Sequence, residues 1–138
     1  MLLPVFRVIL GVVHAELGQT AEAAAVLSRL IETGVDRLPE DLNWGPSLAM
    51  AASLCHQVHH QPGAAAVHDL LEPYADLAAG HSLLFVGSVS HALGLLATTL
   101  GHLDEADGRF AAAHDMHERL EAPIWLARTR LEWGRMLL

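Results

Sequence analysis

The stretch LGLLATTLGHLDEA (residues 93–106) has a near copy earlier in the chain, where residues 10–23 read LGVVHAELGQTAEA. Both segments follow the pattern L-G-x5-L-G-x3-E-A, and the copies are 83 residues apart. The second Leu-Gly pair of each copy follows an apolar run, and glycine ends helices because it adopts the left-handed conformation at little cost. Acidic residues follow, where the positive end of a helix dipole favours them. Each copy therefore predicts two helices joined by a short turn.

A degraded third copy lies halfway between these two. Ala51 and Ala52 replace the first Leu-Gly pair, His59 stands at the turn glycine, and His68 takes the place of Leu27 and Phe110. Small residues recur at 11, 52, 94 and 134, at intervals of 41, 42 and 40 residues. A fixed period of this size is typical of stacked helical hairpins. The residues expected to pack the repeats together are Gly11, Gly18, Ala23, Ala52, Ala64, Gly94, Gly101, Ala106, Phe110 and Gly134.

The fold class predicted from this period is all-α, an α-solenoid of stacked antiparallel helical hairpins with about seven helices. Residues 1–138 form a single repeat domain in this interpretation, with repeats at about 1–40, 41–80 and 81–121 and a half repeat at 122–138. Residues 34–43 connect the first two repeats. The expected helices are about 3–17, 20–33, 46–60, 63–79, 82–101, 104–121 and 124–137.

Composition limits the function classes. The chain has 52% apolar residues, enough for a core, but only 5% aromatic residues, so Leu, Val and Ala build that core and favour helices. A net charge of −8 argues against direct nucleic-acid binding, which needs clustered cations. The single Cys55 excludes an internal disulfide and fits a reducing cytoplasm.

Two apolar stretches raise the question of a membrane. The N-terminal stretch has an internal Arg7 and no A-x-A cleavage pattern, so it is interpreted as a helix rather than a signal peptide. Residues 77–103 lack Asp, Glu, Lys and Arg, but they contain His, Ser, Thr and four glycines. A buried helix of a soluble domain explains them better than a membrane span of about 20 apolar residues. We expect a cytoplasmic protein without membrane contact.

Ten histidines suggest metal binding as one hypothesis. His56, His59 and His60 are spaced i, i+3, i+4, and His114 and His117 form a second pair. Imidazoles on one helix face bind Zn, Ni or Cu. No Asp or Glu is near the first group in the sequence, however, and ordinary surface histidines are the favoured interpretation. Only adventitious metal binding, at His56 and His60, is expected.

The sequence contains no pattern that predicts catalysis. The acids Asp104, Glu105 and Asp107 stand at an expected helix start, where the dipole explains them. Cys55 falls at a buried position of its hairpin, where thiols are inert. The segment GHSLLFVGSVS lacks the spacing of a G-x-S-x-G nucleophile elbow. We expect no enzyme and no cofactor.

The first helices of stacked hairpins line a concave face, where partners usually bind. That face is predicted to be apolar at one end (Val5, Val8, Val12) and cationic at the other. Such a groove suits a peptide with an acidic terminus or a small anionic effector. The alternative is that these residues are simply tolerated at a surface. The candidate groove residues are Ser53, His56, Gln57, Ser88, His91, Thr98, Arg128 and Arg135.

The last helix is expected to be apolar on one face, with Ile124, Leu131 and Leu138, although capping repeats usually present a polar outer side. Either the chain continues in its natural context or this face docks onto another molecule. A homodimer through residues 124–138 is one such possibility.

The repeat pattern resembles the tetratricopeptide repeat, which pairs a small residue in the first helix with an alanine in the second. Gly94, Gly101, Ala106, Phe110 and Ala113 match that pattern. Longer segments, among them FRVILGVVHAELGQTAEA, LPEDLNW, LLEPYA and residues 93–138, are similar to the helical-repeat region of large bacterial regulators of actinobacterial type. In those proteins a P-loop ATPase precedes the repeats, and a LuxR-type helix-turn-helix or a nucleotide cyclase domain lies elsewhere.

Neither a G-x4-G-K-[ST] loop nor a helix-turn-helix signature is present here. The resemblance therefore implies a sensor or scaffold arm from a larger transcriptional or signalling regulator, binding a protein, a peptide or other domains of the parent chain. Three hypotheses follow: an interaction module, a small-molecule receptor that uses the groove, and a metal-binding or enzymatic domain built on the histidines. The first is favoured.

Overall fold

A computed structural model describes residues 4–37, 43–81 and 84–138, with the side chains of Pro4, Val5, His81 and Leu84 outside that description. The described residues are almost entirely helical, which confirms the all-α prediction. The α-helices are α1 (Pro4–Glu16), α2 (Thr20–Thr33), α3 (Trp44–Gln57), α4 (Gln61–Leu71), α5 (Val89–Leu100), α6 (Leu103–Arg119) and α7 (Pro123–Leu137). Short 3-10 turns are η1 (Val35–Arg37) and η2 (Glu72–Tyr74), and a small antiparallel sheet pairs β1 (Ala78–His81) with β2 (Leu84–Ser88).

The turns between paired helices share one backbone geometry. Gly18, His59 and Gly101 have φ values of 75°, 55° and 79°, in the left-handed region. The residue after each of them donates its N–H to a carbonyl five residues back, at 2.8, 2.9 and 2.8 Å. This bond satisfies a carbonyl that the helix end leaves unpaired. Glu121 (φ 51°) and Ala122 repeat the arrangement after α6, so the sequence period has a counterpart in the backbone.

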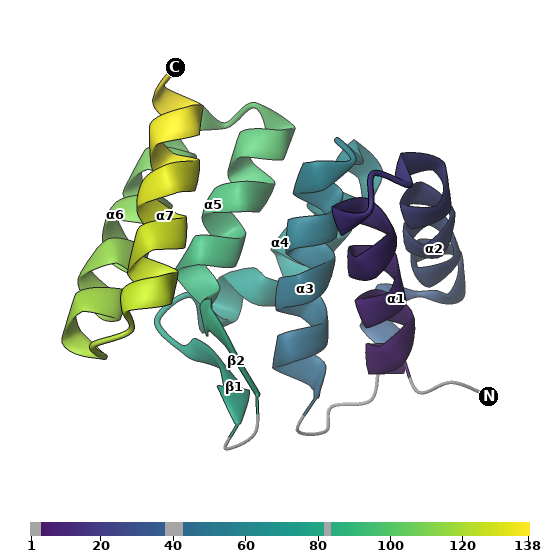
Figure 1. The fold of residues 1–138 in the computed structure, drawn as a ribbon, viewed down its shortest axis with the longest axis horizontal. Coiled ribbons are helices and arrows are strands. Elements are labelled where there is room, and N and C mark those ends of the chain that lie inside the picture. Colours follow the sequence, from purple (N-terminus) through teal and green to yellow (C-terminus); the bar gives the residue numbers. More distant parts are fainter. Residues whose placement is uncertain (1–3, 38–42, 82–83) are drawn as a thin grey trace.

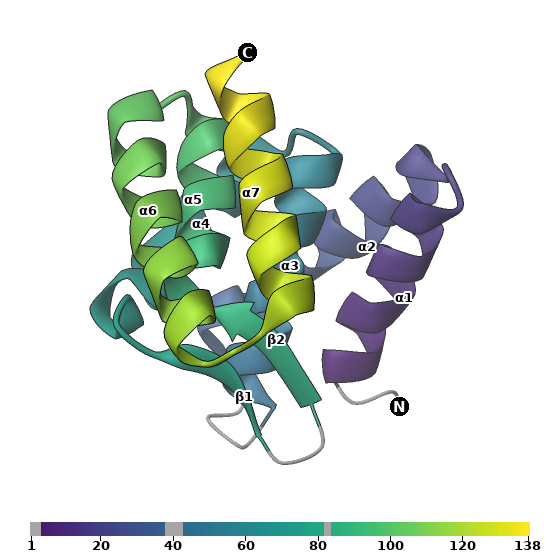
Figure 2. The same cartoon turned by 60° about the vertical axis from the view of Figure 1, so that its left-hand side comes forward.

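The helical hairpins follow one another along the long axis of the molecule in chain order, with α2 outermost at one end and α6 at the other, and the two termini lie at opposite ends (Figure 1). Helix α1 packs on α2 and α3, α3 packs on α4 and α5, and α5 packs on α6. The last helix packs mainly against α6 and only slightly against α5, as the turned view shows (Figure 2). The helices of each predicted repeat are therefore neighbours in space.

Small residues bring the paired helices close together. Gly11 lies against Leu54 and Val26, and Gly94 lies against the ring of Phe110. Ala23, Ala52, Ala64 and Ala106 are fully buried, as are the side chains of Leu27 and Phe110. Their counterpart His68 is partly buried and bonds to Glu105 at 2.7 Å. At Gly134 a side chain would meet nothing within 4 Å, because no described helix packs on that side of α7.

The difference between Gly94 and Gly134 gives a matched pair of substitutions. A Cβ at Gly94 would lie 2.7 and 2.8 Å from ring atoms of the buried Phe110, so Gly94→Ala overpacks the core. We expect Gly94→Ala to lower the free energy of unfolding by about 1–2 kcal/mol. This net value includes the higher helix propensity of alanine, which offsets part of the cost of overpacking. Gly134→Ala has open space and is expected to raise the free energy of unfolding by about 0.5–1 kcal/mol. Urea unfolding of both variants measures this, and equal effects would contradict the close approach at Gly94.

The predicted helices 63–79 and 82–101 are wrong where the β-hairpin lies. Helix α4 ends at Leu71 because Pro73 cannot donate to a helical ladder, and η2 follows. Gly87 has a φ of 87°, which no helix allows. The hairpin ends when the Ser88 hydroxyl accepts the His91 N–H at 3.0 Å and caps α5. The first two residues of the predicted helix 82–101 lie outside the described residues. Residues 38–42 of the predicted connection 34–43 also lie outside them.

Within the part of the chain that the structure describes, no helix has the length and apolar character that a membrane span requires. Most of the described part of the uncharged run 77–103 lies in β1, β2 and the twelve-residue helix α5.

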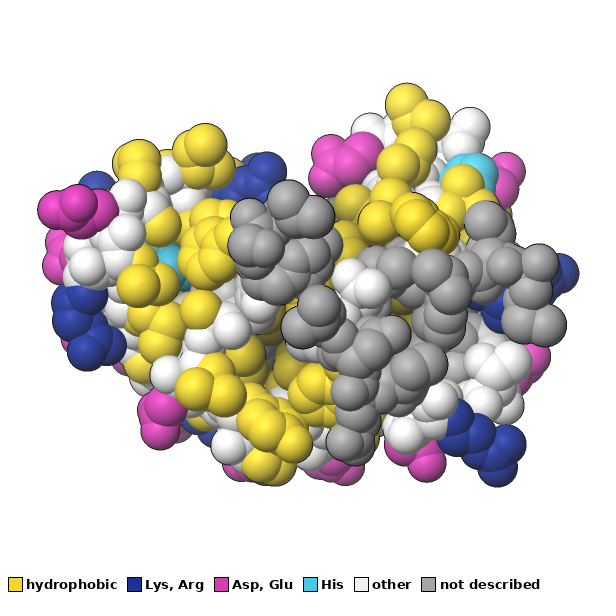
Figure 3. Space-filling model, turned by 90° about the horizontal axis from the view of Figure 1, so that it is seen from below, with side chains coloured by type: hydrophobic (Ala, Val, Ile, Leu, Met, Phe, Trp, Pro, Cys, Tyr) yellow, Lys and Arg dark blue, Asp and Glu magenta, His cyan; other side chains and the backbone are white. Residues whose placement is uncertain are grey.

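Apolar side chains remain exposed at both ends of the helical row. Phe6 on α1 and Leu17 in the turn after it are exposed, and on α7 Ile124 is 70% exposed. Seen from below, hydrophobic side chains are spread over the face, while charged side chains lie mostly toward its edges (Figure 3). The apolar face predicted for the last helix is thus partly exposed, although Leu131 also contributes to the cavity described next.

Candidate ligand-binding groove

A cavity of about 390 Å³ opens between the first helices of the hairpins, and we call it the groove. Its walls come from α1, α3, α5 and α7, with Val86 of β2 at one side. Five of the predicted groove residues line it, namely Ser53, His56, Gln57, His91 and Arg128. The other lining residues are Val12, Glu16, Ala49, Met50, Val86, Ala92, Leu95, Trp125, Leu131 and Glu132.

Three predicted groove residues lie elsewhere. Ser88 is fully buried and caps α5, because the hairpin replaces the helix that was expected to expose it. The Thr98 hydroxyl donates to the carbonyl of Gly94 in its own helix, at 2.8 Å. Arg135 is exposed and donates to Glu132 at 3.0 Å. Of the apolar end, Val12 lines the groove, whereas Val8 lines a separate cavity.

A chain of buried hydrogen bonds ends at His91 in the groove wall. The Ser88 backbone N–H donates to Nε2 of His117 at 2.9 Å. Thr129 Oγ1 lies 3.1 Å from Nδ1 of His117 and 2.9 Å from Nδ1 of His91. His117 and Thr129 are fully buried, and His91 is 6% exposed. The chain joins β2, α6, α7 and α5 through side chains that are far apart in the sequence.

The donors in this chain fix both imidazole tautomers. Nε2 of His117 accepts a backbone N–H, so a neutral His117 carries its proton on Nδ1 and donates to Thr129. The Thr129 hydroxyl then donates to Nδ1 of His91, because otherwise its proton would be buried without an acceptor. A neutral His91 therefore carries its proton on Nε2.

Both histidines are held in the neutral form. Burial, with a smaller contribution from the neighbouring His117, lowers the pKa of the His91 imidazole to about 4. Burial also lowers the pKa of His117. A charged imidazole would lose its hydration here without gaining an acceptor. Near pH 7 this part of the groove wall is uncharged.

Trp125 forms the wall beside His91. Its ring packs on the backbone of Gly87, where a Cβ would come within 2.6 Å of Cε3. The His91 ring meets the indole edge-on, with centroids 5.6 Å apart. The Arg128 guanidinium lies over the indole, 5.0 Å from its centroid, in a cation–π contact. Gly87 and the hairpin thus place the aromatic surface on which Arg128 rests.

Glu132 is the acid inside the groove, and its two oxygens are both occupied. Oε2 lies 3.2 Å from Nε2 of His56, and Oε1 accepts from Arg135 at 3.0 Å. The hydrogen bond from His56 lowers the pKa of the Glu132 carboxyl. No acid is near the first histidine group in the sequence, but α7 brings Glu132 to His56 from 76 residues away.

The remaining histidines do not assemble as the sequence spacing suggested. His56 also contacts Thr99, at 3.3 Å, and Nδ1 of His60 accepts the Gly63 N–H, so both residues of the expected adventitious pair are engaged elsewhere. His59 occupies an exposed turn. His117 is fully buried, whereas His114 lies with Asp115 and Glu118 at the surface.

Cys55 lies in the buried core, as the sequence predicted. Burial raises the pKa of the Cys55 thiol to about 12. The thiol is therefore protonated near pH 7, and a protonated buried thiol is a poor nucleophile. Its role in the described structure is to pack beside Gly63.

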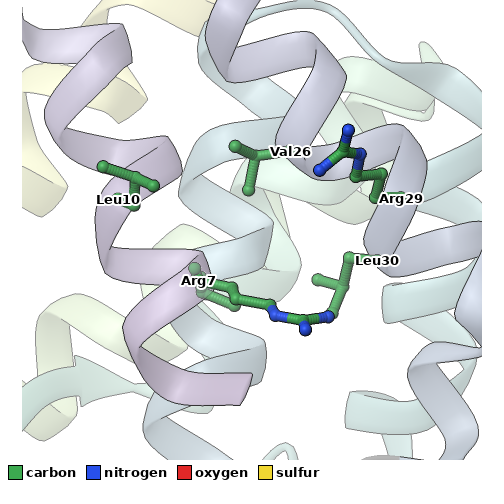
Figure 4. A pocket seen from close by; sticks show the side chains of 6 residues that line it. Arg7, Leu10, Val26, Arg29 and Leu30 are labelled. Atoms are coloured by element: carbon green, nitrogen blue, oxygen red, sulfur yellow. The ribbon is translucent and has the colours of Figure 1, made fainter. Parts of the chain in front are cut away.

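A second cavity, of about 320 Å³, lies between α1 and α2 (Figure 4). Its lining is largely apolar, with Leu10, Val26 and Leu30, while the Arg7 side chain extends toward Leu30. Arg29 is at its edge. Few polar groups converge here, so the groove is the stronger candidate site.

Comparison with protein-family models, curated proteins and solved structures finds no match to this chain. The resemblance to tetratricopeptide repeats and bacterial regulators therefore rests on the residues and segments quoted above. Thr129 and Trp125 were missed as site residues. Both stand on the last helix at positions that sequence spacing alone does not connect with His91.

Proposed function

We propose that this chain is a tetratricopeptide-like α-solenoid segment that acts as a non-catalytic interaction and regulatory module. In this proposal it is the sensor or scaffold arm of a cytoplasmic bacterial transcriptional or signalling regulator coupled to an ATPase, of the kind that carries a LuxR-type or nucleotide cyclase domain. The repeated left-handed turns at Gly18, His59 and Gly101 support the repeat assignment. The proposal includes no catalytic step, no cofactor and no direct nucleic-acid contact.

The observation that carries the proposal is the convergence of polar side chains from three helices on one groove. Ser53, His56 and Gln57 come from α3, His91 comes from α5 and Arg128 comes from α7. Polar groups that converge in a largely apolar cavity are typical of binding sites. A peptide, supplied by a partner or by another domain of the parent chain, is the occupant that an open groove of this kind favours.

A small-molecule effector is the second candidate. A volume of about 390 Å³ falls within the range of roughly 300–1,000 Å³ that is usual for ligand pockets. The exposed apolar residues of α7, Ile124 among them, offer a further surface for other domains of the parent chain or for a second copy in a homodimer.

Peptide display against the purified chain tests the groove. We expect it to enrich peptides whose affinity falls at least about tenfold when Ser53→Trp fills the groove, a loss of about 1.4 kcal/mol. Arg119→Trp, at an exposed position of α6 outside the groove, should leave their affinity unchanged. Circular dichroism establishes that both variants are folded. Peptides that bind both variants equally, or no enrichment at all, would contradict an interaction role for the groove.

A further inference from the structure

We propose that the groove recognises a carboxylate monoanion attached to an apolar group, with His91 Nε2–H and the Arg128 guanidinium as its hydrogen-bond donors. This inference rests on the proposed binding function of the groove and names the chemistry of its ligand. The inference rests on two observations: which hydrogen-bond donors of the groove have no partner among the described residues, and what charge those donors carry.

The first donor is His91. Its Nδ1 is occupied by the Thr129 hydroxyl, which leaves the proton on Nε2. No described residue bonds to Nε2, and no fully buried side-chain nitrogen or oxygen of the described residues lacks a partner. Nε2 of this largely buried ring therefore reaches the open space of the groove, which His91 lines. Through Thr129, His117 and Ser88 the ring is held in a single orientation before any ligand arrives.

The second donor is Arg128. The indole of Trp125 supports its guanidinium, and no carboxylate of the described residues forms an ion pair with it. Glu132, whose two oxygens contact His56 and Arg135, forms no ion pair with Arg128. Glu16, the other acid of the lining, is exposed to solvent on α1. Arg128 is therefore a cation in the groove wall that has an aromatic support and, among the described residues, no anionic partner.

These two groups set the charge of the ligand. His91 is a neutral donor and Arg128 carries one positive charge. These two donors are therefore complementary to an acceptor group with one negative charge. Both lie against the same indole, within 5.6 Å and 5.0 Å of its centroid. A carboxylate has two acceptor oxygens and the planar shape that a guanidinium prefers.

The rest of the ligand must be apolar. Met50, Val86, Leu95, Leu131 and the face of Trp125 form the remaining wall. Two sources supply such a ligand: a small organic acid with a hydrocarbon body, or the C-terminal carboxylate of a peptide whose last residue is apolar. The chemistry at His91 and Arg128 is the same for both.

The experiment compares acids with their uncharged amides. Hexanoate and phenylacetate are titrated beside hexanamide and phenylacetamide, and N-acetyl-Ala-Leu is titrated as the free acid and as the C-terminal amide. Isothermal titration calorimetry measures each affinity. We expect an acid to bind at least about tenfold tighter than its amide, because a hydrogen bond to a charged group is stronger than one to a neutral group. The series that binds, organic acids or peptides, identifies the source.

Variants locate the carboxylate. Arg128→Gln is expected to remove the preference for acids, whereas Arg130→Gln, two residues along α7 and bonded to His114 outside the groove, should retain it. His91→Gln keeps a side-chain donor and is expected to bind more tightly than His91→Leu. A nitrogen NMR spectrum of the His91 side chain should show protonated Nε2 and unprotonated Nδ1 in the unbound protein, as the orientation argument requires.

The outcomes separate this inference from the proposed function. If acids and amides bind the wild type equally and Ser53→Trp abolishes both, the groove is a binding site but carboxylate recognition is wrong. If Arg130→Gln weakens acid binding as much as Arg128→Gln does, the site assignment is wrong. If no probe of either series binds, the carboxylate inference is overturned, while the peptide display still decides on the interaction role.

Discussion

Replacing Thr129 with valine is expected to lower the free energy of unfolding by about 3 kcal/mol, a large effect for the loss of one hydroxyl. Valine keeps the branched shape, so the cost comes from the two imidazoles. Nδ1–H of His117 loses its acceptor and Nδ1 of His91 loses its donor, and each unpaired buried group costs about 1–3 kcal/mol. Urea denaturation followed by circular dichroism measures the loss.

Thr98→Val is the matched control. The Thr98 hydroxyl donates only to the carbonyl of Gly94 within its own helix, and that carbonyl remains in the α5 hydrogen-bond ladder. We expect this variant to lose less than about 1 kcal/mol, near the net value of an ordinary hydrogen bond. Similar losses in Thr98→Val and Thr129→Val would mean that Thr129 does not join the two histidines.

Acidification from pH 7 to pH 4 is expected to remove about 3 kcal/mol of stability through His91 alone. Burial lowers the pKa of His91 from 6.5 to about 4 in the folded chain. Between these values the unfolded chain binds a proton that the folded chain does not bind, so stability falls as the pH falls. The contribution of His91 is complete above about pH 6.5 and is lost by about pH 4. Each pKa unit is worth about 1.4 kcal/mol.

Urea unfolding at several pH values, for the wild type and His91→Gln, isolates this contribution. The variant cannot bind the proton, so its stability should decline by about 3 kcal/mol less over the same range. The comparison is clearest above pH 5. The folded-state pKa values of Glu105 and Glu132 are lowered, so the contribution of these two carboxylates to the free energy of unfolding is lost only at lower pH. Parallel pH profiles would show that His91 is not buried in its neutral form.

The sequence predicted the all-helical fold because its strongest signals are local. A Leu-Gly pair followed by an acid in the next turn marks the same helix end at Gly18 and Gly101, and both positions have the left-handed conformation. His59 could be placed only through the period, since nothing in its residue type requires a positive φ. Pro73, Gly80 and Gly87 were the available signs of an interruption before α5, but the segment was predicted as two helices, 63–79 and 82–101, because the uncharged run 77–103 was interpreted as a buried helix.

The groove was predicted in part because positions along each first helix follow from the helical period. Ser53, His56, Gln57, His91 and Arg128 lie where the repeat pattern put them. The prediction for Ser88 was wrong because Ser88 belongs to strand β2 and not to a helix. The bonds of Thr129 and Glu132 depend on how α7 packs, and no local pattern specifies which residues of distant helices meet.

The position of Trp125 also gives the groove a spectroscopic use. The other indoles lie elsewhere, Trp44 against Tyr74 and Trp133 on Asp107. Phenylalanine at positions 44 and 133 would leave one fluorophore, seated between Gly87 and the Arg128 guanidinium. Any molecule that enters would displace water from that ring and change its emission, so occupancy could be followed optically without an attached dye.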